Sequence, residues 1–124
     1  MILNLTQHPA TPSQIEAGVI DLPESGHQRA TLHELLTFHE LPTADDIEGR
    51  AIALAALAAG HAPGVNEAMI GGASWLMPAL ERALKDEGIQ PLYAFSLRES
   101  AESIQQDGST RKVNVFRHVG FINA

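Results

Sequence analysis

Short apolar runs alternate with polar segments rich in glycine and proline along the 124 residues of this chain. Runs of four to six residues bounded by turn-forming residues are typical of buried strands. They occupy residues 2–5, 19–22, 67–70 and 91–96. The pattern therefore predicts four strands.

Helical signals lie between the predicted strands. Thr11 and Gln14 have the spacing of a capping box, and Pro12 suits the first helical position. Gly18 ends that short helix by supplying a left-handed position after its last turn. The apolar spacing over residues 31–38 predicts a second, amphipathic helix.

Two longer helices are predicted in the middle of the chain. Thr43 caps the first, acidic residues fill its first turn, and Gly60 stops it. Because this helix is apolar on almost every side, we expect it to be covered on more than one side. The second helix follows residues 71–74 and runs to Glu87, with two i,i+4 ion pairs expected on its outer face.

The end of the chain has a different pattern. Asp107 and Gly108 are a hairpin turn signal, and residues 112–119, rich in valine and phenylalanine, form one arm of the hairpin. Alternating strands and helices followed by a hairpin predict an α/β fold with a mostly parallel sheet and an antiparallel C-terminal edge. We expect one domain spanning residues 1–124.

Composition removes several classes of function. The chain has no cysteine, which excludes disulfides and thiol catalysis, and its histidines lack the spacing of a metal site, so we expect no metal and no cofactor. A net charge of −7 argues against binding long nucleic acids. The longest apolar stretch is too short to span a membrane, and the N-terminus lacks a signal-peptide pattern, so we expect a cytoplasmic protein.

The third predicted strand runs into Gly71, Gly72 and Ser74, just before a helix. Unpaired backbone N–H groups at such a turn attract anions, and glycine lets a phosphate approach the main chain. The glycines therefore predict a ligand-binding turn, with Ser74 capping the helix or donating to a phosphate. The alternative is a tight turn with a purely structural role.

Two further polar segments follow predicted strands. Thr6, Gln7 and His8 follow the first strand, and residues 96–100 follow the fourth. Because ligands of open α/β sheets bind beyond the carboxyl ends of the strands, we expect three polar loops to meet at one edge. The alternative for His8 is a hydrogen bond within its own turn.

Three residues near the end of the chain are candidates for chemistry. Arg98 has the planar, bidentate side chain that suits a phosphate, although an ion pair with Glu99 is the alternative. Ser96 begins the same polar segment. His118 lies in an apolar strand and is either a proton-transfer group or a structural histidine.

Several segments resemble a known group of proteins. Residues 91–100 (PLYAFSLRES), 106–109 (QDGS) and 115–121 (VFRHVGF) resemble the C-terminal third of small stand-alone CRISPR-associated proteins of the ring-nuclease type. Residues 2–12 (ILNLTQHPATP) are similar to the start of another such small family. The resemblance covers about half of the chain and implies a Rossmann-like, three-layer domain.

The same resemblance implies a function. It implies a homodimer that binds a cyclic oligoadenylate second messenger across its two-fold axis and, in some relatives, cuts the ring without a metal. The ribose 2′-hydroxyl would attack the adjacent phosphorus in line. In that reading Gly71, Gly72 and Ser74 cradle phosphate, and residues 6–8 contact ribose and base. Arg98 stabilises charge, while His118 and Ser96 complete the catalytic set.

Three functions stay open from the sequence. The chain is a metal-independent phosphodiesterase, a module that senses or sequesters a nucleotide without cutting it, or a structural protein that binds a partner. In the last case the glycine pair is only a turn, and the apolar helix over residues 47–59 forms a dimer face.

Overall fold

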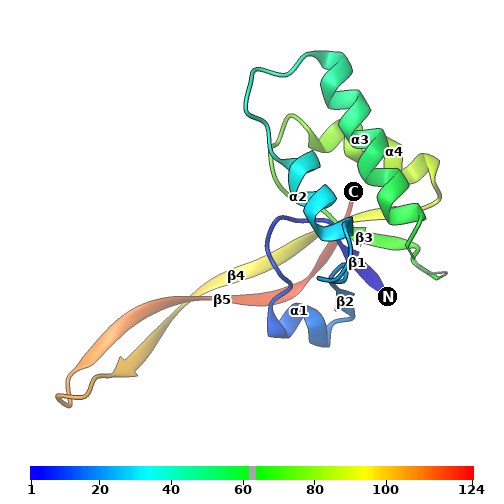
Figure 1. Cartoon of the computed structure of the whole chain (residues 1–124). Helices are drawn as coiled ribbons and strands as arrows, with labels where there is room; N and C mark the ends of the chain where they lie inside the picture. Colours follow the sequence, from blue (N-terminus) through cyan, green and yellow to red (C-terminus); the bar gives the residue numbers. More distant parts are fainter. Residues whose placement is uncertain (62–63) are drawn as a thin grey trace.

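A five-stranded sheet organises the computed structural model, which describes residues 1–61 and 64–124 (Figure 1). The strands are β1 (Ile2–Asn4), β2 (Val19–Ile20), β3 (Glu67–Met69), β4 (Gln90–Ile104) and β5 (Thr110–Asn123). The helices are α1 (Pro12–Glu16), α2 (Gln28–Leu36), α3 (Ala44–Ala59) and α4 (Met77–Asp86).

The strand order is β2-β1-β3-β4-β5. The first four strands are parallel, and β5 is antiparallel to β4. Helices α2, α3 and α4 lie on one face of the sheet and α1 on the other (Figure 1). The predicted α/β fold, a mostly parallel sheet with an antiparallel C-terminal edge, is confirmed.

Buried side chains form one cluster on each face of the sheet. The larger cluster joins the sheet to α2, α3 and α4, and its Leu54, Leu80 and Leu84 are fully buried. The smaller cluster includes Ile2, Val19, Met69 and Leu92, whose alternation with the larger cluster along each strand places it on the α1 face. Burying a leucine side chain contributes about 2 kcal/mol, so the larger cluster dominates the stability.

The predicted helix starts at Thr11 and Thr43 are confirmed. At each, the threonine hydroxyl accepts a hydrogen bond from the backbone three residues on, and the side chain of that residue, Gln14 or Asp46, accepts one from the threonine N–H. Gly18 follows α1 with a φ of 104°, a conformation that favours glycine. Local hydrogen bonds therefore fix where these helices begin.

Of two expectations about helix surfaces, one is confirmed and one is wrong. Helix α3 packs against both α2 and α4, as expected, and leaves exposed a stripe that includes Ile52. The ion pairs expected within α4 are replaced by contacts to other elements. Arg82 lies 3.5 Å from Glu48 of α3, and Glu81 accepts a hydrogen bond from Tyr93 of β4.

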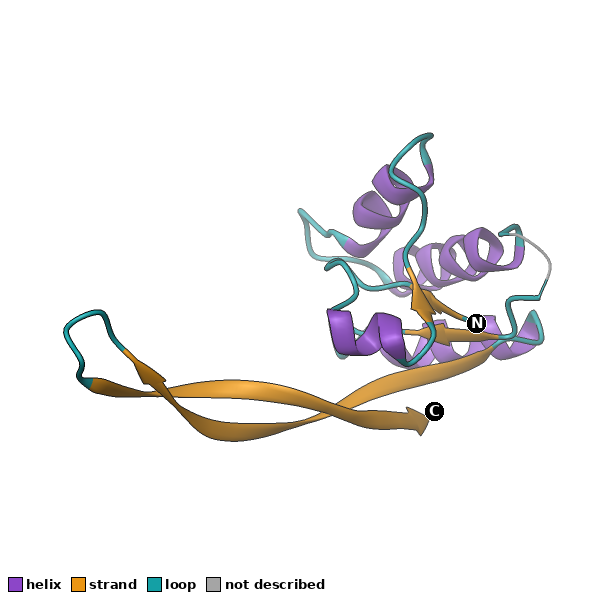
Figure 2. Ribbon diagram, turned by 90° about the horizontal axis from the view of Figure 1, so that it is seen from below, coloured by secondary structure: helices purple, strands orange, loops and turns teal. Residues whose placement is uncertain are grey.

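The hairpin is much longer than the sequence indicated. Its predicted turn is confirmed, since the Asp107 carboxylate accepts hydrogen bonds from the N–H and hydroxyl of Ser109, and Gly108 has a φ of 85°. Strand β3 pairs with β4 only as far as Leu92, and from there β4 and β5 continue as a two-stranded ribbon. We call residues 95–120 the hairpin arm; it extends well beyond the helices (Figure 2).

The expected polar loop over residues 96–100 does not exist. These residues are part of β4 and pair with residues 114–118 of β5. Their polarity led to the wrong interpretation. Both faces of the arm lie outside the helix layers, so polar side chains are accepted there while the ladder satisfies the backbone.

Candidate functional site

The carboxyl ends of β1 and β3 meet at one edge of the sheet, because the two strands are parallel and adjacent, and the neighbouring strand β4 continues past this edge. A cleft of about 550 Å³ opens there, within the size range of small-molecule sites. It is lined by Thr6, Gln7, His8, Pro9, Thr11, Gln14, Met69, Ile70, Gly71, Gly72, Tyr93 and Ala94. Two of the three predicted loops are therefore brought together.

Gly71 of one loop lies beside Thr6 of the other. A side chain on Gly71 would begin 3.6 Å from the methyl group of Thr6, so the missing Cβ leaves open space between the loops. Gly72 has a φ of 138°, which only glycine adopts without strain. The backbone conformation at position 72 thus requires glycine, whereas glycine at position 71 leaves room for a ligand.

The backbone N–H groups of Gly71, Gly72 and Ala73 donate no hydrogen bond to any residue that the structure describes. Two of these residues line the cleft. Consecutive free amides in a glycine-containing turn form a concave site for an anion, because each N–H carries a partial positive charge. This chemistry suits a phosphate or carboxylate oxygen.

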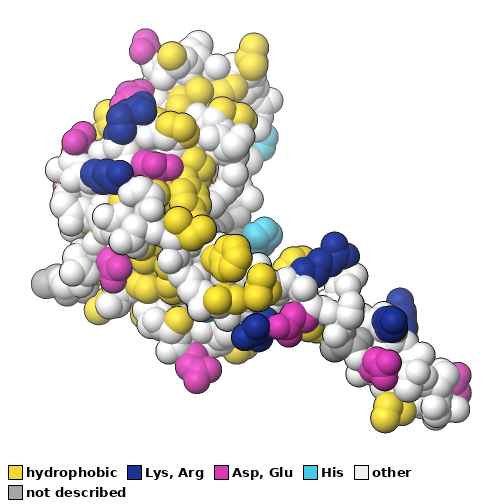
Figure 3. Space-filling view, turned by 180° about the vertical axis from the view of Figure 1, so that it is seen from behind, with side chains coloured by type: hydrophobic (Ala, Val, Ile, Leu, Met, Phe, Trp, Pro, Cys, Tyr) yellow, Lys and Arg dark blue, Asp and Glu magenta, His cyan; other side chains and the backbone are white. Residues whose placement is uncertain are grey.

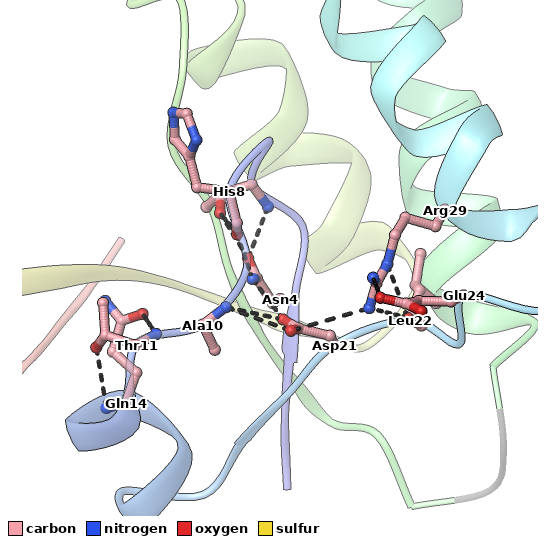
Figure 4. Close-up of polar contacts among 10 residues, drawn as sticks. Asn4, His8, Ala10, Thr11, Gln14, Asp21, Leu22, Glu24 and Arg29 are labelled. Atoms are coloured by element: carbon pink, nitrogen blue, oxygen red, sulfur yellow. Dashed lines mark hydrogen bonds and ion pairs between the residues drawn. The ribbon is translucent and has the colours of Figure 1, made fainter.

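Asn4 holds the loop over residues 5–8 in place (Figure 4). It is 3% exposed, and its Nδ2 donates to the carbonyl oxygen of His8 at 2.8 Å and to Asp21 Oδ1 at 2.7 Å. Its Oδ1 accepts from the N–H of Thr6 at 2.9 Å and from the Thr6 hydroxyl at 2.7 Å. One buried amide therefore shapes the β1 side of the cleft.

Asp21 extends this network toward α1. Its carboxylate accepts hydrogen bonds from the N–H of Ala10 at 3.1 and 3.3 Å and lies 3.9 Å from a guanidinium nitrogen of Arg29 (Figure 4). Neither Asn4 nor Asp21 was among the residues predicted from the sequence. The available signal was a polar residue inside the apolar run over residues 2–5, since buried polar groups need partners.

The three residues of the β1 loop that were predicted to contact a ligand differ in how far their side chains are already hydrogen-bonded within the protein. The Thr6 hydroxyl proton is directed to Asn4 and the His8 carbonyl, so that hydroxyl can only accept from a ligand. Gln7 Nε2 makes long contacts of 3.4 Å to Leu36 and Thr37. The imidazole of His8 is exposed and points away from the Asn4 network (Figure 4).

Strand β4 contributes Tyr93 and Ala94 to the cleft rather than the predicted polar segment. The Tyr93 hydroxyl donates to a carboxylate oxygen of Glu81 at 2.6 Å. Burial raises the pKa of Tyr93, and the hydrogen bond to Glu81 raises it further. Tyr93 is therefore a neutral, anchored side chain at neutral pH.

Ser96 and His118 lie opposite each other on the hairpin arm. Ser96 is two residues beyond Ala94 on the same strand, so it shares the face that borders the cleft. A register shift beside Phe95 leaves Val119 as the extra residue of a bulge. The His118 ring packs 4.7 Å from Phe121, and its buried Nδ1 forms no hydrogen bond within the described residues.

Arg98 and Ser74 lie outside the cleft lining. Arg98 is exposed on the arm opposite Phe116, and the expected pairing of Glu99 is made with Arg117 instead, at 2.8 Å. Ser74 does not cap α4, whose N-cap is Leu76 without a side-chain hydrogen bond. The helix starts at Met77, which places Pro78 in its first turn, where proline is tolerated.

Two further features are absent from residues 1–61 and 64–124. Within those ranges, no three histidine or acidic side chains come together in a group that could hold a metal ion. In the same part of the chain, no helix combines the length and apolar character needed to cross a membrane.

A family model for the uncharacterized protein MJ1673 family matches residues 1–122. The chain belongs to the MJ1673 family. Nothing among curated proteins and nothing among solved structures matches it. The description of the MJ1673 family gives no ligand, reaction or partner, so the resemblance to CRISPR-associated proteins stays a prediction.

Proposed function

We propose that this MJ1673-family protein binds a nucleotide phosphate in the cleft at the carboxyl edge of its sheet. The observation that carries the proposal is the meeting of Gly71 and Gly72, with free backbone amides, and the loop of Thr6 in one cleft. Amides aimed at an anion stabilise it even without a lysine or arginine.

The ligand that we propose is a cyclic oligoadenylate, as the resemblance of the chain's two ends implies. A cleft of about 550 Å³ suits one nucleotide unit better than a whole ring. A ring of repeated units would then be shared by two equal clefts, which a symmetric homodimer supplies.

The proposed reaction is in-line attack by a ribose 2′-hydroxyl on the adjacent phosphorus. The new bond joins the 2′-oxygen to phosphorus, the bond from phosphorus to the 5′-oxygen breaks, and the products are a 2′,3′-cyclic phosphate and a 5′-hydroxyl. His118 takes the proton of the 2′-hydroxyl, beside Ser96, and a proton from solvent neutralises the leaving oxygen. Arg98 stabilises the negative charge on the phosphorane.

A second function, binding without cleavage, is favoured by the composition of the cleft. Its lining residues include one histidine, His8, and no lysine, arginine, aspartate or glutamate. Arg98 and His118 lie on the arm rather than in the lining. A cleft of this kind can hold a nucleotide through backbone amides while lacking an acid–base pair for catalysis.

Incubation of the purified protein with cyclic tetra-adenylate in EDTA separates these functions. Linear products on chromatography support the phosphodiesterase, and retention of the intact ring on the protein supports the sensor. Absence of both binding and products refutes the nucleotide proposal and leaves the structural role. If the protein is a phosphodiesterase, Arg98→Ala lowers its turnover by about tenfold or more, because the negative charge of the transition state loses a stabilising contact.

A further inference from the structure

The face of β4 and β5 that continues the α4 side of the sheet carries large apolar side chains that are exposed. Tyr93 packs on the helix-side core, so Phe95 and Leu97, at alternate positions, share its face. On β5, Ile122 pairs with Tyr93, Gly120 with Phe95 and Val115 with Glu99, so these residues lie on that face too, beside the charged pair Glu99 and Arg117. We call Phe95, Leu97, Val115 and Ile122, with Gly120 among them, the hairpin patch.

The side chains of the hairpin patch are unusually open for their size. Phe95 and Ile122 are 45% and 53% exposed. Hydrophobic side chains gather where the arm leaves the helix-covered part of the molecule, and charged ones lie beyond them (Figure 3). Contiguous exposed apolar surface of this kind marks an interaction site.

A groove borders the patch along β5. It measures about 350 Å³ and is lined by Phe95, Val119, Gly120, Phe121 and Ile122. A Cβ built on Gly120 would meet no atom within 4 Å, so the floor of the groove is open backbone. The large Phe95 side chain and an open groove over Gly120 thus lie next to each other.

Charge favours a second copy of this chain as the occupant. Residues 1–89 carry four basic and twelve acidic groups, whereas residues 90–124 carry four basic and three acidic groups. Two copies of the chain therefore repel each other through residues 1–89, which are strongly acidic, but not through residues 90–124. At the patch, the only ion pair in the described residues is Arg117 with Glu99, which is neutral as a unit.

The available area fits a dimer as well. Besides the patch, the arm exposes Val119 by 51%, and a two-stranded ribbon standing alone is marginally stable in water. One side of a standard interface buries about 800 Å², and these apolar side chains supply several hundred Å² of it. A two-fold interface needs one patch that complements itself, and the protruding Phe95 side chain next to the groove over Gly120 meets that need.

We propose that two copies of the chain associate through the hairpin patch, with Phe95 of each copy entering the groove over Gly120 of the other. The contact lies on the face of the arm opposite Ser96 and His118. The inference stands on the patch alone and holds whether or not the cleft binds a nucleotide.

The first test measures the mass of the protein in solution by light scattering, without any ligand. We expect a dimer for the wild type at about 100 μM and at least tenfold weaker association for Phe95→Glu. The matched control is Phe116→Glu, because Phe116 is 73% exposed on the other face of the same arm. A monomeric wild type, or equal weakening by both variants, overturns the proposal.

The second test keeps the proposal falsifiable if Phe95→Glu fails to fold. The chain has no cysteine, so introduced cysteines are the only thiols that can form a disulfide. Mixing Phe95→Cys with Gly120→Cys under mild oxidation should give a disulfide-linked heterodimer, because the geometry places those positions in contact across the interface. Cross-linking that is no faster than with Phe116→Cys in place of Phe95→Cys contradicts the proposed contact.

Discussion

The helix-covered part of the sheet and the hairpin arm use strands in opposite ways. Strands β1 and β3 are only three residues long, and most of their side chains are buried between helices. The arm has the longest strands of the chain, and its residues are mostly exposed. Short strands serve here to bring loops to a common edge, whereas long strands carry side chains away from it.

This difference separates two kinds of evidence for function. At the edge of the covered sheet, hydrogen bonds between Asn4 and Thr6 hold the β1 loop in place, so this side of the cleft is preformed. On the arm, β4 and β5 are held mainly by each other. We therefore propose ligand binding for the first region and association between chains for the second.

Core truncation should show the largest contrast between the regions. Leu80 is fully buried, so Leu80→Ala should lower the free energy of unfolding by about 3 kcal/mol. Ile104 near the tip of the arm is 78% exposed, and Ile104→Ala should change it by less than about 0.5 kcal/mol. Urea denaturation checks both. A comparable loss at Ile104 would mean that the arm is part of the folding core.

The two asparagines Asn4 and Asn114 give the next contrast. Asn4→Ala leaves the Thr6 N–H and the His8 carbonyl without their partner, and should cost about 2–3 kcal/mol. Asn114 is exposed on β5, so Asn114→Ala should be nearly neutral. Equal stability of the two variants in urea would show that the buried network does not support the loop.

Tyr93, where the two regions join, should produce a smaller effect that depends on pH. The pKa of Tyr93 is raised above its ordinary value of 10.0 in the folded protein. The unfolded chain therefore loses this proton first, so the stability is complete below pH 10 and falls as the pH rises further. Tyr93→Phe should cost about 1 kcal/mol at neutral pH through the lost hydrogen bond.

The same variant should also flatten the alkaline decline in melting temperature. Tyr93 is the only tyrosine of the chain, so no other tyrosine contributes to that decline. An identical alkaline decline with and without its hydroxyl would mean that this proton is not linked to folding.

Two aspartates should give the smallest contrast. The pKa of Asp46 is lowered by hydrogen bonds from Thr43, and that of Asp107 by hydrogen bonds from Ser109. Their stabilisation is present above about pH 4 and is lost as the pH falls below it. Asp46→Asn should reduce the acid dependence of the melting temperature, because α3 belongs to the core. Asp107→Asn, at the tip of the arm, should not; the reverse order would contradict the division into regions.

Much of the fold could be predicted because its signals are local. The capping boxes at Thr11 and Thr43 and the turn at Asp107 depend on side chains within three residues of each other. The parallel order followed from the alternation of strands and helices. Gly71, Gly72 and residues 6–8 were found because ligand sites of such sheets follow the strands.

The rest could not be predicted because it depends on contacts that are distant in the sequence. Asn4 reveals its role only when Asp21 is placed beside it. Polar residues 96–100 indicate a loop until their pairing with β5 is known.

Calorimetric titration with cyclic tetra-adenylate, comparing Gly71→Leu with the wild type, tests the central claim most directly. The added side chain begins 3.6 Å from Thr6 and fills the space between the two loops. Gly49→Ala on α3, where an added Cβ meets nothing within 4 Å, is the matched control. The account predicts binding by the wild type and the control, and at least about tenfold weaker binding by Gly71→Leu. Unchanged binding by a folded Gly71→Leu, or none by the wild type, would contradict it.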